Sequence, residues 1–113
     1  MNISGVPQGA DTLISTGTNQ QMDVAIAYDN PNYLVVWSDI RTGLTRDIYG
    51  ARVTPAGAVL DFGGIAISTA FNDQLVPAVA FDGTNYLVVW QDRRPGFFYD
   101  IYGQIVARTG ALV

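Results

Sequence analysis

The chain has 113 residues, of which 49% are hydrophobic and 14% are charged, so it suits one compact domain with a sizeable apolar core. All ten acidic residues are Asp and all six basic residues are Arg, while Glu, Lys, His and Cys are absent. The net charge of -4 argues against a nucleic-acid partner, and the missing residue types include most general bases, nucleophiles and transition-metal ligands. We therefore expect no catalytic residues, no metal site, no cofactor and no enzymatic activity.

Good helix formers are scarce, whereas Val, Ile, Tyr, Phe, Thr, Gly and Asn are plentiful, which predicts an all-β fold. Apolar runs such as Tyr33 to Trp37 and Tyr86 to Trp90 are far shorter than the roughly 20 residues of a membrane span, so we expect no membrane partner. Without cysteines, the sequence does not indicate a cellular compartment.

Two copies of one sequence follow each other at an offset of 53 residues. The offset leaves 60 aligned pairs in a chain of 113 residues, and 25 of these pairs are identical. The runs Tyr33 to Trp37 and Asp47 to Gly50, for example, recur as Tyr86 to Trp90 and Asp100 to Gly103. A fixed period of this size is typical of solenoids and propellers, in which single units cannot bury their faces alone.

In each copy, turn-forming residues between apolar stretches predict four strands. The chain begins with an extra copy of the fourth strand, at about Asp11 to Thr16. The first copy then predicts strands at Val24 to Tyr28, Tyr33 to Trp37, Asp47 to Val53 and Ile65 to Thr69, and the second copy at Ala78 to Phe81, Tyr86 to Trp90 and Asp100 to Ala107. Turn-forming residues separate the first two strands of each copy, and the unbroken apolar run of the second predicts a central strand covered on both faces.

Four short antiparallel strands per repeat indicate a β-propeller blade. We therefore predict a single two-blade module over residues 1–113. Residues 1–22 form an outer strand and link, residues 23–75 the first blade with its link, and residues 76–113 a second blade that lacks its fourth strand. Pairing of the N-terminal strand with Asp100 to Ala107 of another copy removes both open edges, so we expect a homo-oligomer. Three or four chains would give a ring of six or eight blades.

The second copy also resembles a known family. Its run from Pro77 to Gly83, followed by Tyr86 to Trp90, then Asp92-Arg93-Arg94 and Asp100-Ile101-Tyr102, is similar to the repeat of TolB-type bacterial β-propellers. The resemblance implies a propeller fold. The two-blade arrangement is also similar to small fucose-binding bacterial lectins, which close by trimerisation, although their sugar-site sequence is absent here.

The best polar motif is Trp-x-Asp-x-Arg, which joins Asp39 to Arg41 and Asp92 to Arg94. Either these are structural ion pairs that fix a loop, or they form an anion or sugar site. Binding residues concentrate on loops over a rigid scaffold, which predicts a ligand face where these loops and the interblade links gather. The predicted ligand-binding residues are Asn19, Gln21, Arg41, Asn72, Gln74, Arg94, Phe97, Phe98 and Tyr99.

Two functions remain open at this point. The first is a non-enzymatic, self-assembling propeller module, a scaffold that could also be a fragment of, or engineered from, a longer repeat protein. The second is a multivalent lectin, because aromatic residues beside Arg suit carbohydrate or peptide recognition and a ring multiplies weak sites.

Overall fold

A computed structural model describes residues 9–113, and within these residues the chain is all-β, with seven strands and no helix. Residues 1–8 of the predicted N-terminal segment lie outside the described part. The strands are β1 (Gln21–Tyr28), β2 (Tyr33–Asp39), β3 (Asp47–Val53), β4 (Ile65–Ser68), β5 (Gln74–Phe81), β6 (Asn85–Asp92) and β7 (Asp100–Ala107). The described residues contain no helix that could cross a membrane.

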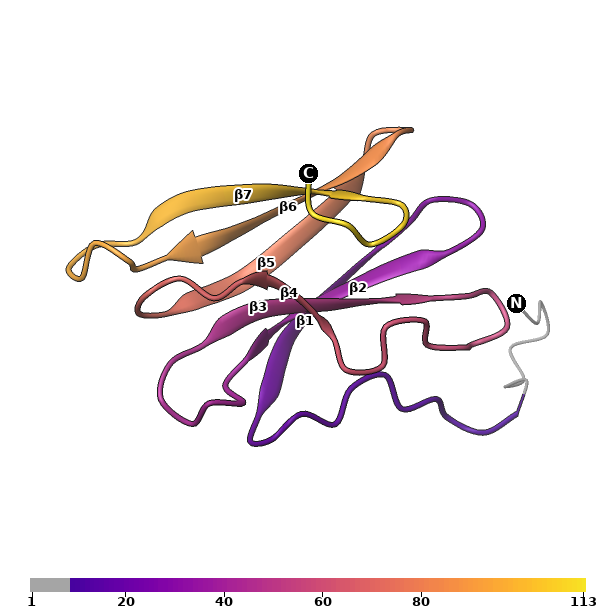
Figure 1. Cartoon of the computed structure of the whole chain (residues 1–113), viewed down its shortest axis with the longest axis horizontal. Helices are drawn as coiled ribbons and strands as arrows, with labels where there is room; N and C mark the ends of the chain where they lie inside the picture. Colours follow the sequence, from indigo (N-terminus) through magenta and orange to yellow (C-terminus); the bar gives the residue numbers. More distant parts are fainter. Residues whose placement is uncertain (1–8) are drawn as a thin grey trace.

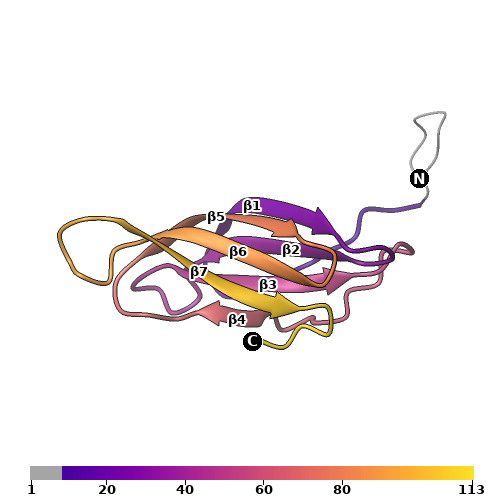
Figure 2. The same ribbon diagram turned by 90° about the horizontal axis from the view of Figure 1, so that it is seen from above.

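The strands form two antiparallel sheets, and each sheet corresponds to one copy of the repeat. The first sheet has the order β1-β2-β3-β4, and the second has the order β5-β6-β7. The two sheets are stacked, with β5 lying against β1 and β2 (Figures 1 and 2). The predicted strands are all present except the N-terminal one, and most extend a few residues beyond their predicted limits.

The first turn of each copy is held by an aspartate, as the predicted hairpins require. The carboxylate of Asp29 accepts a hydrogen bond from the backbone N–H of Asn32 at 2.9 Å. In the second copy, the carboxylate of Asp82 accepts hydrogen bonds from the N–H groups of Thr84 and Asn85, both at 2.8 Å. An Asp side chain that bonds nearby backbone N–H groups stabilises the chain reversal.

The two sheets pack in a front-to-back manner. We call the face of the first sheet that carries Leu34, Val36 and Ile48 its front, and the opposite face its back. The same names apply to the residues 53 positions later in the second sheet. The front of the first sheet packs on the back of the second, which carries Val88 and Trp90. All five of these side chains are almost fully buried.

On the front of the first sheet, the side chain of Ile67 packs directly over the backbone at Gly50, where a larger residue would not fit. A Cβ atom at Gly50 would lie 3.0 Å from Ile67 Cδ1 and 3.0 Å from the Val35 carbonyl oxygen, closer than side chains normally approach.

Arg108 connects the open end of the second sheet to the first, since its Nη2 donates to the carbonyl oxygens of Asp29 at 3.1 Å and Asn30 at 2.8 Å.

Each copy carries a β-bulge in its first strand. The register shifts between Met22 and Ala25 in β1 and between Leu75 and Ala78 in β5. The bulged residues Asp23 and Val76 occupy equivalent positions and have φ angles of 58° and 50°. A β-branched residue rarely adopts a positive φ, so Val76 introduces backbone strain that Asp23 does not.

Two expectations differ from the structure. Residues 11–17, which include the strand predicted at about Asp11 to Thr16, form no strand within the chain. Ile14 of this segment packs against a face of the first sheet, and the segment pairs with none of the strand edges. In addition, β2 is buried on both faces, as its apolar run predicts, but β6 is buried on one face only. Leu87 on the front of β6 is 49% exposed because no described segment covers that face.

Candidate functional site

The Trp-x-Asp-x-Arg motif forms the same cluster in both sheets. In the first, the carboxylate of Asp39 accepts hydrogen bonds from Trp37 Nε1 at 2.9 Å, from Arg41 Nε at 3.0 Å and from Arg41 Nη2 at 2.8 Å. The Arg41 guanidinium lies over the Tyr49 ring, 3.7 Å from its centroid. This arrangement saturates the aspartate and immobilises the arginine.

The second sheet repeats these contacts. Asp92 accepts from Trp90 Nε1 at 2.9 Å and from Arg94 Nε and Nη2 at 3.0 and 2.7 Å. The Arg94 guanidinium lies 3.6 Å from the centroid of the Tyr102 ring. Burial on its own would raise the pKa of Asp92, but the hydrogen bonds from Arg94 and Trp90 outweigh it and hold the pKa below its ordinary value.

Both arginines therefore form structural ion pairs with these aspartates, and the pairs fix the loop after the second strand of each sheet. One difference separates them. Arg41 Nη1 also donates to the carbonyl oxygen of Gly63 at 3.0 Å, in the segment that leads into β4. Arg94 has no such partner among the described residues, none of which occupies the place of Gly63 in the second sheet.

The two glutamines among the predicted site residues also have structural partners. The buried Gln74 donates from Nε2 to the carbonyl oxygens of Phe71 at 3.2 Å and Asn72 at 3.1 Å. Gln21 donates to the carbonyl oxygen of Gly17 at 3.0 Å. These amides shape the segments that enter β1 and β5.

The asparagines lie in the same two segments. Asn19 and Asn72 both adopt positive φ angles, of 64° and 63°, which Asn tolerates better than most residues. Asn72 Nδ2 also donates to the carbonyl oxygen of Arg93 at 3.2 Å. Their conformations and contacts help to define the entry into each sheet.

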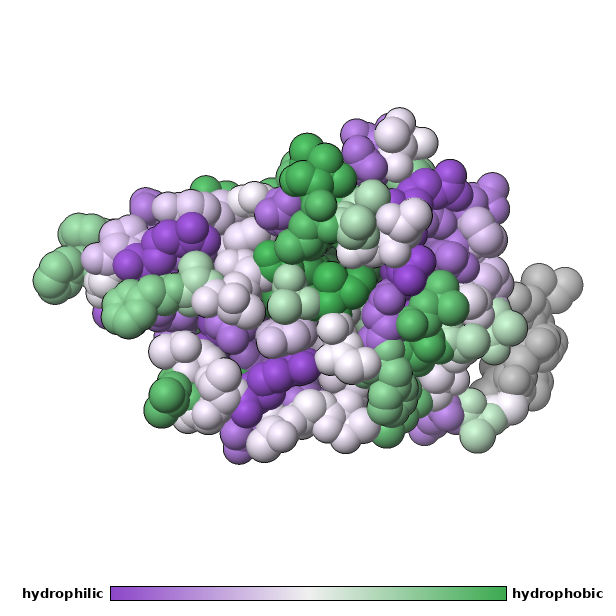
Figure 3. Space-filling model, viewed as in Figure 1, coloured by the Kyte–Doolittle hydropathy of each residue, from purple (hydrophilic) through white to green (hydrophobic). Residues whose placement is uncertain are grey.

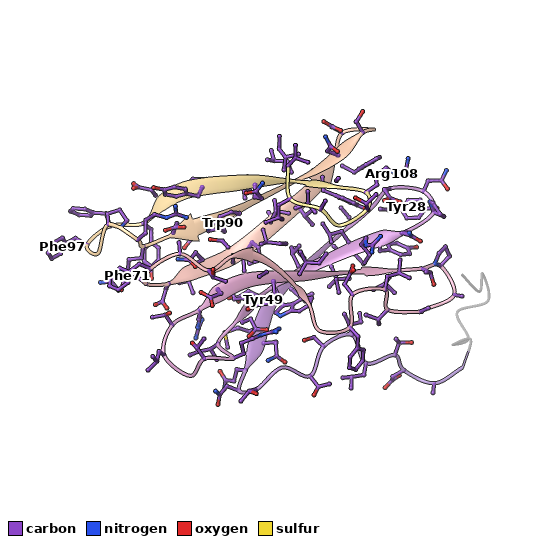
Figure 4. The ribbon with its side chains drawn as sticks, in the orientation of Figure 1. Tyr28, Tyr49, Phe71, Trp90, Phe97 and Arg108 are labelled. Atoms are coloured by element: carbon purple, nitrogen blue, oxygen red, sulfur yellow. The ribbon has the colours of Figure 1, made fainter. Side chains whose placement is uncertain are left out.

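The predicted aromatic residues, by contrast, are open to solvent. Phe97 and Phe98 are 86% and 77% exposed, and Tyr99 is 44% exposed. They belong to the β6–β7 loop, which projects from one end of the molecule, as the label of Phe97 shows in Figure 4. All nine predicted residues gather at this loop end, although they divide between the two sheets and do not form one cluster.

The front of the second sheet is an apolar surface that no described segment covers. Ile101 and Ile105 are 72% and 43% exposed, next to the half-exposed Leu87. Figure 3 shows hydrophobic side chains gathered over the part of the molecule where β6, β7 and the C-terminal residues lie. In the first sheet the equivalents of Leu87 and Ile101, Leu34 and Ile48, are fully buried against the second sheet.

Among the described residues, the N-terminal segment and Val59 pack against the back of the first sheet. Ile14 packs against the cluster formed by Val35, Trp37, Ala51 and Val53. Its equivalent Ile67 belongs to the cluster that contains Val88, Trp90 and Val106, the matching residues of the second sheet.

A second contact repeats in the same way. Thr12 Oγ1 lies 3.2 Å from where a Cβ atom at Gly57 would stand, and Ile65 Cδ1 lies 3.2 Å from the same point at Gly110. Residues 12–19 therefore lie on the first sheet as residues 65–72 lie on the second. The repeated Ile-Ser-Thr motif indicated an extra copy of the fourth strand at about Asp11 to Thr16, but its packing on the first sheet of the same chain was not predicted.

Among residues 9–113, no group of three or more acidic side chains is arranged to hold a metal ion. No protein-family model, curated protein or solved structure matches this chain.

Proposed function

We propose that this chain is a non-enzymatic homotypic interaction module whose two sheets act as blades of a β-propeller completed by other copies of the chain. In this account, the exposed front of the second sheet binds the back of the first sheet of the next copy. The intramolecular packing of the two sheets supplies the template for this contact. The observation that carries the proposal is the equivalence of residues 12–19 and 65–72 in their contacts with the two sheets.

The N-terminal segment explains why such a contact would complete a blade. In the first sheet, β4 pairs with β3 at Ile48↔Ser68, Tyr49↔Ala66 and Gly50↔Ile65. The 53-residue offset translates these pairs into Ile101↔Ser15, Tyr102↔Leu13 and Gly103↔Thr12 of the next copy. Since residues 12–19 already lie against the sheet on which the neighbouring copy would dock, one rigid-body approach brings both contacts together.

Arg94 supports the same register. Residue 63, whose carbonyl oxygen binds Arg41, corresponds to Ala10. In the assembly, the carbonyl oxygen of Ala10 of the next copy would take this place beside Arg94. The assembly would thus provide an acceptor for a guanidinium nitrogen that has no equivalent partner within the described chain.

A head-to-tail contact either closes into a ring or continues into a fibre. Propellers of about four to eight blades close, and three or four chains of two sheets each satisfy that range. The right match between front and back faces is already present between the two sheets of one chain. We therefore propose a closed ring of three or four copies.

Cross-linking between single-cysteine variants tests the proposed strand pairing, and the natural chain contains no cysteine that would interfere. Ser15→Cys chains are mixed with Ile101→Cys chains, oxidised, and analysed by mass spectrometry. We expect a disulfide-linked pair that contains one chain of each kind. The matched control replaces Ser15→Cys by Thr16→Cys, whose side chain points to the opposite face of an extended strand.

The two outcomes of the cross-linking experiment are distinct. Preferential formation of the mixed pair with Ser15→Cys, and much less with Thr16→Cys, supports the register. Equal yields from both mixtures, or no mixed pair at all, would contradict the proposed strand donation.

A further inference from the structure

A cavity of about 460 Å³ opens at the loop end of the first sheet. It lies between the loop that joins β2 to β3 and the link that joins β4 to β5. The side chains that define its chemistry are Thr42, Leu44, Asp47, Tyr49, Phe71 and Asn72. Figure 4 labels Phe71 and Tyr49, which come from the link and from β3.

Asp47 is the unusual residue of this cavity. It is only 6% exposed and stands directly opposite Asp39 in the β2–β3 register. The carboxylate of Asp39 is saturated by Trp37 and Arg41, whereas the carboxylate of Asp47 accepts no hydrogen bond from any described residue. Its remaining access to hydrogen-bond donors is through the cavity that it lines.

This position is costly for the fold. Burial raises the pKa of Asp47 to about 6, and the nearby charge of Asp39 adds to the effect. An Asn or Ser would fit the position without placing two carboxylates opposite each other. A side chain that costs stability and lines a cavity is a candidate for ligand binding.

The other walls restrict the kind of ligand. The aromatic ring of Phe71 is 78% exposed, although it lines the cavity. An anionic ligand is disfavoured, since both Asp47 and the adjacent Asp73 carry negative charge. The walls combine an exposed aromatic ring, a carboxylate acceptor, a threonine hydroxyl and an asparagine amide.

We propose that this cavity binds a neutral saccharide, whose hydroxyl groups donate hydrogen bonds to Asp47 and whose C–H face packs on the ring of Phe71. A sugar matches these walls because it presents hydroxyl donors at its edge and an apolar face. The site is built by one chain, so its binding does not depend on the assembly proposed above.

The test uses saturation-transfer NMR of the natural chain with methyl glycosides of glucose, galactose, mannose, fucose and N-acetylglucosamine. We expect at least one of them to bind with a dissociation constant in the millimolar range or tighter. The variants Asp47→Asn and Phe71→Ala should each weaken that binding at least tenfold. Both are expected to fold, because the first removes a buried charge and the second changes an exposed ring.

Two control variants complete the experiment. Asp23→Asn and Phe62→Ala remove an exposed carboxylate and an exposed ring that do not line this cavity, and they should leave the affinity unchanged. Absence of binding by every glycoside overturns the proposal, as does binding that survives both Asp47→Asn and Phe71→Ala. Displacement of the bound glycoside by propylammonium at equal concentration would also overturn it, since it would indicate a site for cations.

Discussion

Ile14 and Ile67 occupy equivalent positions, each packed against the tryptophan-containing cluster on the back of a different sheet. Ile67 is part of β4 in the first sheet, and the cluster that it covers lies on the back of the second sheet. Ile14 covers the first sheet in the same manner, yet no described strand pairs with the segment that carries it. This relationship is the main reason for proposing that another copy supplies the missing sheet.

The packing of Ile14 predicts a stability effect within one chain. Ile14→Ala should lower the free energy of unfolding by about 1–2 kcal/mol, because it removes partly buried methyl groups from the Trp37 cluster. Leu13 is 62% exposed, so Leu13→Ala should change the free energy of unfolding by less than about 0.5 kcal/mol. Urea unfolding under conditions where the protein is monomeric measures both. Equal effects would show that the segment does not pack on the sheet.

The bulge in β5 predicts a stabilising substitution. Val76 has a φ of 50°, and its equivalent in the first sheet, Asp23, has a φ of 58°. Val76→Asp should raise the free energy of unfolding by about 1 kcal/mol, because Asp accepts a positive φ at lower cost than a β-branched residue. Val76→Ile keeps the branching and should give no gain. If thermal unfolding shows the same midpoint for both variants, the strain at Val76 is not significant.

The raised pKa of Asp47 predicts a pH dependence of stability. The folded-state pKa of about 6 lies above the ordinary value of 3.8, so the folded state binds this proton more tightly than the unfolded state. The contribution is fully present below about pH 4 and is lost as the pH rises through 6, for a total of roughly 2–3 kcal/mol. Asp47→Asn should remove this decline and leave the variant more stable at pH 7.

The matched control for this pH profile is Asp100→Asn, at the equivalent but exposed position of the second sheet. Denaturant unfolding of the three proteins between pH 4 and pH 7 provides the comparison. The natural chain and Asp100→Asn should lose stability in parallel, while Asp47→Asn should not. A flat profile for the natural chain would contradict the assigned burial of Asp47.

The ion pair of the second sheet predicts a large effect of removing one partner. The side chain of Asp92 is fully buried, and Arg94 Nη2 lies 2.7 Å from its Oδ2. Arg94→Met would leave a buried carboxylate without its cation and should cost about 3 kcal/mol. The neighbouring Arg93 is exposed, so Arg93→Met should cost less than about 0.5 kcal/mol. Similar losses in chemical denaturation would argue against a structural role for Arg94.

The sequence predicted the all-β class, the strands of both copies and the aspartate turns, because these depend on local patterns that both copies share. Tertiary context decided the rest. Asp47 and Asp100 stand in the same local sequence, yet one is buried and the other exposed. Among the described residues, only the first sheet has a fourth strand and a following link, residues 69–72, beside this aspartate. Likewise, nothing in the side chain of Val76 indicates a positive φ.

The sequence indicated which residues the candidate site would contain, but it predicted their roles less well. The Asp-Arg spacing correctly indicated an ion pair, since alternate residues of a strand share a face. The cavity beside Asp47 was missed, because an apolar strand followed by a polar loop does not indicate which side chains will face each other. Phe97, Phe98 and Tyr99 were predicted from their place beside Arg94 in the loop between the second and third strands of the repeat, and they are exposed in the structure.

The solution mass tests the central claim most directly. Light scattering during size-exclusion chromatography should give three or four times the chain mass of 12.2 kDa. Ile101→Asp, which places a charge on the exposed front of the second sheet, should reduce the mass to that of one chain, whereas Leu44→Asp, on an exposed loop, should not. A folded natural chain that remains at 12.2 kDa across the accessible concentrations would contradict the proposed assembly.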